Sequence, residues 1–565
     1  MLQVLSTIRG ETRNESPWDV YPRPQMRRDS YLNLNGEWQF GTHPKSLDRR
    51  VLVPFCPESA LSGVNVHFAE GQWLCYRRYV TLPEGFRRER LLLHIGAADQ
   101  RTRVSVNGHL AGDYHGLGSH CVDVTDHWQE GENELTVYCQ DDLRDQSFPY
   151  GKQVLPEKRG GMWYTTVSGI WQSVWMESVP ETHIRKLNIE NRGASVLIST
   201  EPALNGTVRV AGLGEFALEN GRVAITPAEP HFWSPEDPYL YDFTITAGED
   251  RVESYFAIRT LEVTKVGKYP RLCLNGKPYF FHGLLDQGYW PEGIYTPAAP
   301  ECYADDILAM KKLGFNTLRK HIKVEAEEFY YQCDKLGMIV WQDMVNNSDY
   351  SFIRDTALPT AFPGYQKRGD KRLHPREEHR RRFLEGMEIT VNQLKNHPSI
   401  CLWTIFNEGW GQFEADMVYD QFLKLDDTRF IDSTSGWFRR EKSHVDSRHV
   451  YFRRIRLEGD GKKPLILSEF GGKTYRAEGH VFNPDKSYGY GGCKTPEQLN
   501  AAVQKLYMEE VLPCIPKGLC AAIYTQVSDV EDEINGVLTY DRKICKLSPE
   551  IMLPVSEALQ SALEK

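Results

Sequence analysis

The chain has 565 residues, of which 41% are apolar and 25% charged, with a net charge of −10. Domains usually run to about 100–200 residues, so this length predicts about three of them. A nucleic-acid-binding protein would show a basic face, which this balance of charge does not provide. The longest apolar runs are far shorter than the ~20 residues that a membrane helix needs, so no membrane span is expected.

The twelve cysteines are scattered and form no CxxC pair. The first residues also lack the basic and apolar segments of a signal peptide. We therefore expect reduced thiols and a cytoplasmic protein, with a leader removed before residue 1 as the alternative.

Residues 1–180 read as a β-domain. Short alternating segments at 36–40, 73–80, 88–95, 102–106 and 133–138 predict strands. The dipeptides Asn35-Gly36 and Asn107-Gly108 predict tight hairpins between such strands. Many short strands with turn signals between them are typical of a jelly-roll β-sandwich.

Residues 181–264 continue in strands, at 194–198, 206–210 and 241–245. A segment of about 80 residues with this pattern fits one small immunoglobulin-like β-sandwich.

Residues 265–565 change to an alternation of strands and amphipathic helices. Eight candidate strands begin at positions 279, 316, 338, 400, 430, 449, 464 and 520. This number of βα units over about 300 residues predicts a (β/α)8 barrel. A doubly wound open sheet is the alternative, but no glycine-rich phosphate fingerprint follows any of the strands. The expected fold class is therefore multidomain β plus α/β.

In a (β/α)8 barrel the functional residues lie where strands end and βα loops begin. The fourth candidate strand runs into Asn407 and Glu408, and the seventh runs into Glu469. Other polar residues at strand ends are Asp286, Arg319, His321, Asp343 and Gln526. Two carboxylates at the same barrel mouth could face each other across a substrate.

Paired carboxylates are what the hydrolysis of a glycoside requires. One protonated carboxyl donates to the leaving oxygen, and the other attacks the anomeric carbon or activates water. In the retaining case the two groups lie about 5–5.5 Å apart. Either glutamate alone would more often be structural, and it is their pairing on ordered strands that indicates a catalytic site.

Several motifs resemble glycoside hydrolase family 2, the family of β-galactosidases, β-glucuronidases and β-mannosidases. Leu34-Asn-Gly-Glu-Trp-Gln-Phe40, Val53-Pro-Phe-Cys-Pro-Glu-Ser59 and Gly169-Ile-Trp-Gln172 resemble its N-terminal jelly roll. The run Leu313-Gly-Phe-Asn316 with Arg319, then Asn396-His-Pro-Ser399 before Asn407-Glu408, resembles its barrel signature. The resemblance covers nearly the whole chain.

The resemblance implies that Glu408 is the acid/base and Glu469 the nucleophile of a double displacement. Asn407 would contact the 2-hydroxyl of the sugar. No redox cofactor is implied. We also expect no required metal, because His444 and His449 lack a metal-ligand spacing with nearby carboxylates. A loosely held Mg²⁺ at the barrel mouth is left open.

Departures from the family pattern bear on the substrate. The segment after the second strand reads Arg319-Lys-His-Ile-Lys-Val-Glu325, and Glu533 stands where β-glucuronidases have residues that hold a uronate. A carboxylate there would repel a uronic acid, so β-galactosidase is the nominal expectation. The alternatives are β-glucuronidase, β-mannosidase, an arabinosidase-like activity, or a non-catalytic carbohydrate-binding protein. The chain ends soon after the barrel, without the further domains of large β-galactosidases.

Other residues carry weaker predictions, each with a structural alternative. Asp286 and Gln287 could bind sugar hydroxyls or cap a loop, and Asp343 could bind a hydroxyl or orient Arg319. Aromatic stacking on a sugar or packing in the core is open for Trp410, Trp437 and Tyr524. Lys320 and Lys323 could meet an acidic substituent, but we expect solvated surface lysines. The predicted partner is a β-glycoside or oligosaccharide, with a homo-oligomer possible.

Overall fold

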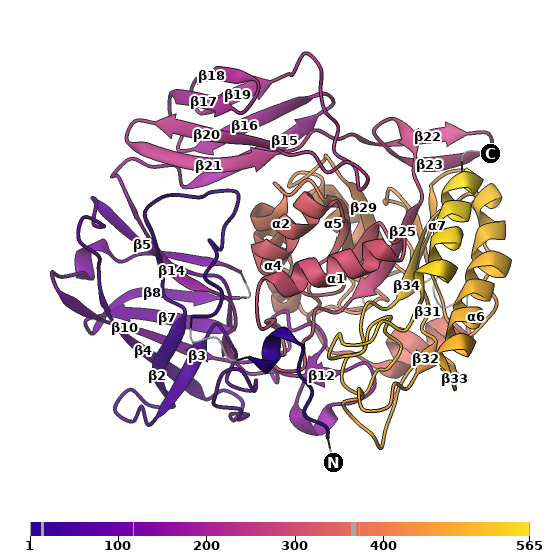
Figure 1. The fold of residues 1–565 in the computed structure, drawn as a ribbon, viewed down its shortest axis with the longest axis horizontal. Helices are drawn as coiled ribbons and strands as arrows, with labels where there is room; N and C mark the ends of the chain where they lie inside the picture. The colour runs from indigo at the N-terminus through magenta and orange to yellow at the C-terminus, as the bar shows by residue number, and fades with distance from the viewer. Residues whose placement is uncertain (1, 13–15, 117, 363–368, 372, 564–565) are drawn as a thin grey trace.

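The computed structural model describes residues 2–12, 16–116, 118–362, 369–371 and 373–563. Two β-sandwiches flank a barrel of strands and helices, and the barrel holds the C-terminal half of the chain (Figure 1). The predicted fold class of jelly roll, immunoglobulin-like sandwich and (β/α)8 barrel is confirmed.

The first sandwich has a six-stranded sheet in the order β3-β2-β4-β10-β7-β8 and a four-stranded sheet in the order β1-β14-β5-β9. Their apolar faces share one core, to which Trp38, Leu91 and Met176 belong. The strands are β1 (Tyr31–Asn33), β2 (Gly36–Gly41), β3 (Arg49–Val53), β4 (Trp73–Thr81), β5 (Arg90–Ile95), β7 (Arg101–Val106), β8 (His109–His115), β9 (His120–Asp123), β10 (Glu132–Gln140) and β14 (Val174–Val179).

One of the two predicted hairpins is correct and the other is wrong. Asn107 and Gly108 join β7 to β8, with φ of 50° and 80°. Asn35 and Gly36 instead carry the chain from one sheet to the other, because β1 pairs with β14 and β2 pairs with β3. The Asn35 amide oxygen accepts from the amide of Val174 at 2.9 Å, so this side chain bonds to a distant strand rather than closing a turn.

The second sandwich packs a three-stranded sheet, β15-β16-β19, on a four-stranded sheet, β18-β17-β20-β21. Alternate residues such as Ile198, Val208 and Ile245 fill the space between them. Its strands are β15 (Lys186–Arg192), β16 (Ser195–Glu201), β17 (Gly206–Val210), β18 (Gly214–Leu218), β19 (Arg222–Ile225), β20 (Tyr241–Ala247) and β21 (Asp250–Phe256). The predicted domain boundary after residue 180 falls between β14 and β15, and the one after residue 264 falls inside β22 (Leu261–Val266).

Eight parallel strands form the barrel, in the order β29-β28-β27-β26-β25-β34-β31-β30. Read as a ring, this order is the order of the sequence, which defines a (β/α)8 barrel and not a doubly wound sheet. The strands are β25 (Phe281–Asp286), β26 (Thr317–Lys320), β27 (Ile339–Asp343), β28 (Ile400–Asn407), β29 (Phe430–Ser435), β30 (Asp446–Val450), β31 (Leu465–Gly471) and β34 (Leu519–Thr525).

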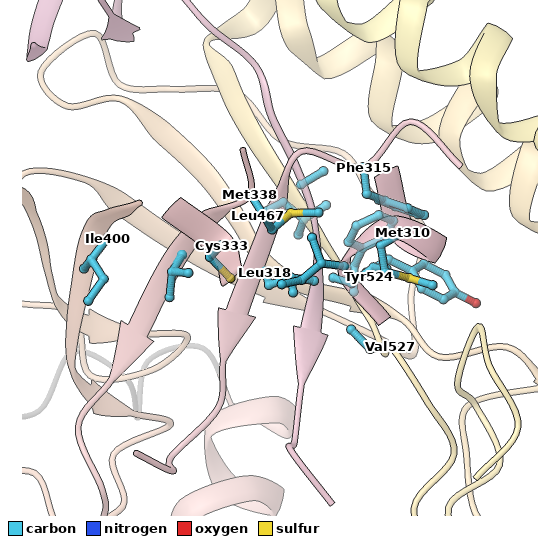
Figure 2. Packing of buried hydrophobic residues seen from close by; sticks show 14 of the residues in the cluster. Met310, Phe315, Leu318, Cys333, Met338, Ile400, Leu467, Tyr524 and Val527 are labelled. Atoms are coloured by element: carbon cyan, nitrogen blue, oxygen red, sulfur yellow. The ribbon is translucent and has the colours of Figure 1, made fainter. Parts of the chain in front are cut away.

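Helices cover the outside of the barrel. They include α1 (Glu301–Lys312), α2 (Glu327–Leu336), α4 (Glu377–Leu394), α5 (Ala415–Phe422), α6 (Pro496–Leu506) and α7 (Pro549–Leu563). Figure 2 shows the resulting core, in which Met310 of α1 and Cys333 of α2 belong to the same cluster as Leu318 of β26 and Ile400 of β28.

The start of β28 is held by buried polar contacts. Asp334 of α2 accepts from His397 Nδ1 at 2.7 Å and from the Ser399 amide at 2.9 Å. Tyr255 of the second sandwich donates to the same carboxylate at 2.7 Å. Arg259 donates to the carbonyls of Pro398 and Ile400. The Asn396–Ser399 motif is thus a turn clamped from two sides, and it begins the strand that ends at Asn407.

Among the described helices, none is long and apolar enough to cross a membrane. All twelve cysteines are free, and nine of them are buried, in keeping with the expected reduced core thiols.

The Asp334 clamp yields a stability prediction. Asp334→Ala should lower the free energy of unfolding by about 3–5 kcal/mol, because it leaves buried donors without their acceptor. Urea denaturation followed by tryptophan fluorescence measures this. The matched control is Asp305→Ala, since Asp305 is 56% exposed in its pair with Arg9. That change should cost under about 1 kcal/mol, and an equal loss in both variants would contradict the clamp.

Candidate active site

Glu408 follows directly on β28 and is aimed by an unusual backbone. Its φ is 52°, in the left-handed region, and its amide donates to the Ser435 carbonyl of β29 at 2.9 Å. The next residue must be glycine, because a Cβ at Gly409 would lie 2.4 Å from the Phe438 ring. This tight turn lifts the Glu408 carboxyl to the barrel mouth, where its side chain is 18% exposed.

Glu469 lies within β31, and its side chain is 6% exposed. Arg319 donates to its Oε1 at 3.0 Å, and the Tyr451 hydroxyl donates to its Oε2 at 2.6 Å. Both carboxylate oxygens therefore have a fixed donor, which sets the direction of their free lone pairs.

The structure brings the two predicted glutamates together. A carboxylate oxygen of Glu408, one of Glu469 and a ring nitrogen of His449 all lie within 4.8 Å of one another. His449 stands between them, with Nδ1 2.7 Å from Glu408 and Nε2 3.6 Å from the Glu469 oxygen. Residues 61 positions apart in the sequence thus meet at one point.

The charges around Glu469 keep it ionised. Burial alone would raise the pKa of Glu469, but the neighbouring side chains of His449 and Arg319, with a smaller effect from His321, lower it to about 2. Glu469 is therefore a carboxylate at neutral pH, as an attacking group must be.

Arg319 connects four of the predicted site residues. Its Nε donates to Asp343 at 3.0 Å, and its second terminal nitrogen donates to the Asn407 side-chain oxygen at 2.9 Å. Asp343 also bonds to His321 Nδ1, at 2.7 Å. Asp343 is 1% exposed, so its place in the structure is to orient Arg319 and His321.

Lys320 and Lys323 are not solvated surface lysines, and that expectation is wrong. They are 1% and 2% exposed and donate to the wholly buried Glu325, at 2.9 Å and 3.0 Å. The buried carboxylate requires cationic partners, which explains why both ammonium groups leave the surface. Asp286 accepts from Lys320 at 2.6 Å and from the Gly288 amide at 2.9 Å, the second bond being that of a loop cap.

The three candidate aromatic residues are all buried. Trp410 is 3% exposed, packs on Trp163 and donates to the Ser348 carbonyl at 3.0 Å. Tyr524 is 2% exposed and belongs to the apolar cluster that Figure 2 shows. Trp437 is 8% exposed and lies against the His449 ring, with 5.7 Å between ring centres.

Glu533 and Gln526 lie deep beside the barrel mouth. Glu533 accepts from the hydroxyl of Tyr164, which belongs to the first sandwich, and from the Asn535 amide at 2.9 Å. Burial raises the pKa of Glu533. Gln526 accepts from Gln287 at 2.9 Å. Among the described residues, Gln287 Oε1 and Asn535 Oδ1 are buried without a hydrogen-bond partner, whereas the Gln526 side chain lies against Glu533.

Sequence reasoning missed several residues at this site. The strand-end rule was not applied to the sixth strand, where it would have selected His449 and Tyr451. His449 contacts two carboxylates that are distant from it in the sequence, so its sequence spacing gave no sign of them. Tyr164 and Lys152 come from the first sandwich, and no pattern in that segment points to the barrel.

The Glu408, His449 and Glu469 donors are close enough to offer a cation site. Both ring nitrogens of His449 already have hydrogen-bond partners, however, at Glu408 and Ser435. The cluster is complete as a hydrogen-bonded network, so we assign no metal to it. The expectation of no required metal stays a prediction.

A barrel with two carboxylates at the ends of its fourth and seventh strands defines a glycosidase-type site. The model described as "Glycosyl hydrolases family 2, TIM barrel domain" matches residues 265–490, and "Glycosyl hydrolases family 2" matches residues 181–259. Together they match more than half of the chain. The chain belongs to glycoside hydrolase family 2.

Curated relatives are distant in sequence. A β-galactosidase of Thermoanaerobacter pseudethanolicus is 24% identical over 450 residues, which cover 73% of this chain and 54% of the relative. A β-glucuronidase of Bacteroides fragilis is 23% identical over 425 residues, covering 68% of this chain and 56% of the relative. The chain thus spans about half the length of such relatives.

Solved structures share the fold over nearly the whole chain. A β-D-glucuronidase of Dictyoglomus thermophilum superposes with a TM-score of 0.72 at 19% identity, covering 95% of this chain and 98% of that one. A β-galacturonidase of Eisenbergiella tayi bound to galacturonate gives a TM-score of 0.66 at 17% identity, covering 96% and 99%. At these identities the likeness shows the fold alone.

The lowered pKa of Glu469 makes stability depend on pH. A carboxyl whose folded pKa is about 2 stabilises the fold fully above its unfolded value near 4.5 and progressively less as pH falls towards 2. The stability of the wild type relative to Glu469→Gln should therefore drop by about 2 kcal/mol between pH 5 and pH 3. Urea denaturation at both pH values measures it, and a constant or rising difference would contradict the assignment.

Proposed function

We propose that the chain is a retaining exo-β-glycosidase, with Glu408 as acid/base and Glu469 as nucleophile. The observation that carries this is the approach of the two carboxylates to within 4.8 Å at the C-terminal ends of β28 and β31. Such a separation suits direct attack by the second carboxylate, whereas inverting enzymes leave about 6.5–9.5 Å for a water molecule.

The two glutamates differ in surroundings as the reaction requires. Glu469 is held ionised by Arg319 and by the Tyr451 hydroxyl, so it can attack the anomeric carbon. Among the described residues, Glu408 forms no ion pair with a lysine or arginine, and it is the more exposed of the two. It is therefore placed to donate to the leaving oxygen and later to receive a proton from water.

The first sandwich supports action on a terminal sugar. Its Tyr164 bonds to Glu533, Arg159 pairs with Glu531 at 3.1 Å, and the Tyr150 hydroxyl donates to the Ser348 carbonyl at 2.7 Å. These contacts bring 150–164 against the loops of the barrel mouth. A site closed on one side by these residues suits one terminal sugar better than the middle of a long polysaccharide.

The expected sugar is neutral, with a β-galactoside as the first substrate to test. Glu533 and the side-chain oxygen of Asn535, which has no partner among the described residues, offer bonds to hydroxyls. A uronate carboxylate in their place would meet the buried acid Glu533, which like charges disfavour.

A β-uronide is the second candidate, and Lys152 favours it. This lysine of the first sandwich is half-buried, with Nζ 5.5 Å from the centre of the Trp163 ring. Burial raises the pKa of Glu533 and lowers that of His321; the charge of Lys152 opposes the first shift and adds to the second, so it lies within electrostatic reach of the site. Within the described part of the chain it has no ion-pair partner, which leaves it free for a substrate carboxylate.

Loss of the nucleophile tests the mechanism. Glu469→Gln should reduce kcat on aryl β-glycosides by about 10⁴-fold or more, because the covalent route disappears. The matched control is Glu478→Gln, an exposed glutamate nearby in the sequence, which should keep wild-type activity. Unchanged turnover in Glu469→Gln, or no turnover of any aryl glycoside by the wild type, would favour another site or a non-catalytic carbohydrate-binding protein.

A panel of aryl β-glycosides tests the sugar. β-Galactoside turnover exceeding β-glucuronide and β-galacturonide turnover is the expected result, and Lys152→Gln should then change kcat/KM by less than about threefold. If uronides are preferred, Lys152→Gln should lower kcat/KM for them by about 10–100-fold and leave neutral glycosides unaffected. Equal losses of kcat/KM on uronides and on neutral glycosides would contradict a role for Lys152 in binding the substrate carboxylate.

A further inference from the structure

We infer that His449 is a positioning residue for Glu408. The hydrogen bonds behind it hold the ring in the form that carries its hydrogen on Nε2, so that Nδ1 accepts from a protonated Glu408. The inference rests on the proposed function, because it explains how the acid obtains and keeps the proton that the first step consumes.

The ring has one partner on each nitrogen. His449 lies on β30 with its side chain 0% exposed. Nδ1 is 2.7 Å from Glu408 Oε1, and Nε2 is 2.9 Å from the Ser435 hydroxyl. A neutral imidazole donates from one nitrogen and accepts at the other. Whether the Ser435 hydroxyl donates to Nε2 or accepts from it therefore decides whether Nδ1 donates to Glu408 or accepts from it.

The Ser435 hydroxyl acts as a hydrogen-bond acceptor for Nε2 of the His449 ring. Its single hydrogen donates to the Ser468 hydroxyl at 3.1 Å. Ser468 lies 2.6 Å from the Ser447 hydroxyl and donates to the Arg448 carbonyl at 3.3 Å, so its own hydrogen has acceptors away from Ser435. With its hydrogen directed to Ser468, Ser435 offers its lone pairs to Nε2.

Arg319 is the other group that could donate to Nε2, at 3.5 Å. The nitrogen concerned has two hydrogens, and these go to the Ser468 carbonyl and to Glu469 Oε1, each at 3.0 Å. With no hydrogen left for the ring, Nε2 must carry its own. Nδ1 of the neutral ring then has a lone pair, and Glu408 supplies the hydrogen between them.

The surrounding charges act in the same direction. The charged groups that face this pair from the neighbouring strands are Arg319 of β26, Asp432 of β29 and Glu469 of β31. The charge of Arg319 is matched by Glu469 and Asp343, both at 3.0 Å. The negative charge of Glu469 disfavours a second one on Glu408. Hydroxyl groups that also face Glu408 belong to Tyr350, Tyr451, Tyr488 and Tyr490.

This arrangement serves both steps. In the first, the Glu408 proton passes to the glycosidic oxygen, which keeps the electron pair of the broken bond, while Glu469 bonds to the anomeric carbon. The Glu408 carboxylate then faces the Nδ1 lone pair, which disfavours its charge. It takes a proton from water, whose oxygen attacks the anomeric carbon and releases Glu469. His449 keeps its own hydrogen throughout.

The kinetic test compares leaving groups. General acid catalysis contributes about 10²–10⁴-fold, and only leaving groups that need protonation benefit from it. His449→Gln, which keeps an amide near Nε2 but not near Nδ1, should lower kcat/KM by about 10–100-fold for alkyl β-glycosides and by less than about threefold for dinitrophenyl β-glycosides. An equal loss on both leaving groups would overturn the inference.

Two further variants separate positioning from folding. His449→Asn places an amide near Nδ1 and should retain more activity on alkyl glycosides than His449→Gln. Ser435→Ala cuts the chain behind the ring and should reproduce the leaving-group dependence more weakly. His183→Gln is the matched control, because His183 bonds to the Pro180 carbonyl near the start of the second sandwich, far from Glu408 in the sequence. A leaving-group effect in that control would also overturn the inference.

Nitrogen NMR of histidine-labelled protein tests the ring directly and needs no substrate, so its outcome is independent of the proposed function. The signals that disappear in His449→Gln identify the residue. A neutral ring with hydrogen on Nε2 at neutral pH is the expected result. Hydrogen on Nδ1 alone, or on both nitrogens, would overturn the inference even if the glycosidase activity is found.

Discussion

The site depends on one buried cation. Arg319 is 0% exposed and uses its fixed fork of donors on Asp343, Glu469, the Asn407 side chain and the Ser468 carbonyl. A guanidinium has a planar, rigid geometry, so these four groups, which lie on β27, β28 and β31, are fixed relative to one another. Without it, two carboxylates would be left in a dry interior, where unpaired charge is strongly disfavoured.

Arg319 affects both the ionisation of Glu469 and the position of the strand end that precedes Glu408. It favours the ionised form of Glu469 and, through Asn407, fixes the end of the strand from which Glu408 is displayed. It also leaves no hydrogen for His449, although it is 3.5 Å away. One side chain thereby affects the charge of Glu469, the end of the strand that precedes Glu408 and the surroundings of the His449 ring between them.

The sequence allowed the architecture and the central pair to be predicted, because both follow local rules. Strand and helix alternation identified the barrel, and polar residues at strand ends identified Glu408 and Glu469. The same rule would have selected His449 and Tyr451 had it been applied to the sixth strand. Burial could not be read in this way: Lys320 and Lys323 look like surface residues in a sequence, and only the position of Glu325 shows why they are inside. The prediction of a hairpin at Asn35-Gly36 was wrong for a similar reason, because the Asn35 side chain bonds to a strand about 140 residues away in the sequence.

Contacts between domains were the least predictable feature. The sequence of residues 150–164 contains no pattern that predicts the bond of Tyr164 to Glu533 or the ion pair of Arg159 with Glu531. These contacts make the first sandwich a wall of the site rather than an appendage. For enzyme engineering, the smallest part of the chain that keeps the whole site therefore includes the first sandwich as well as the barrel. A fragment cut at the start of the barrel would keep both glutamates yet leave the acidic cluster at Glu531–Glu533 without the contacts that Tyr164 and Arg159 make to it.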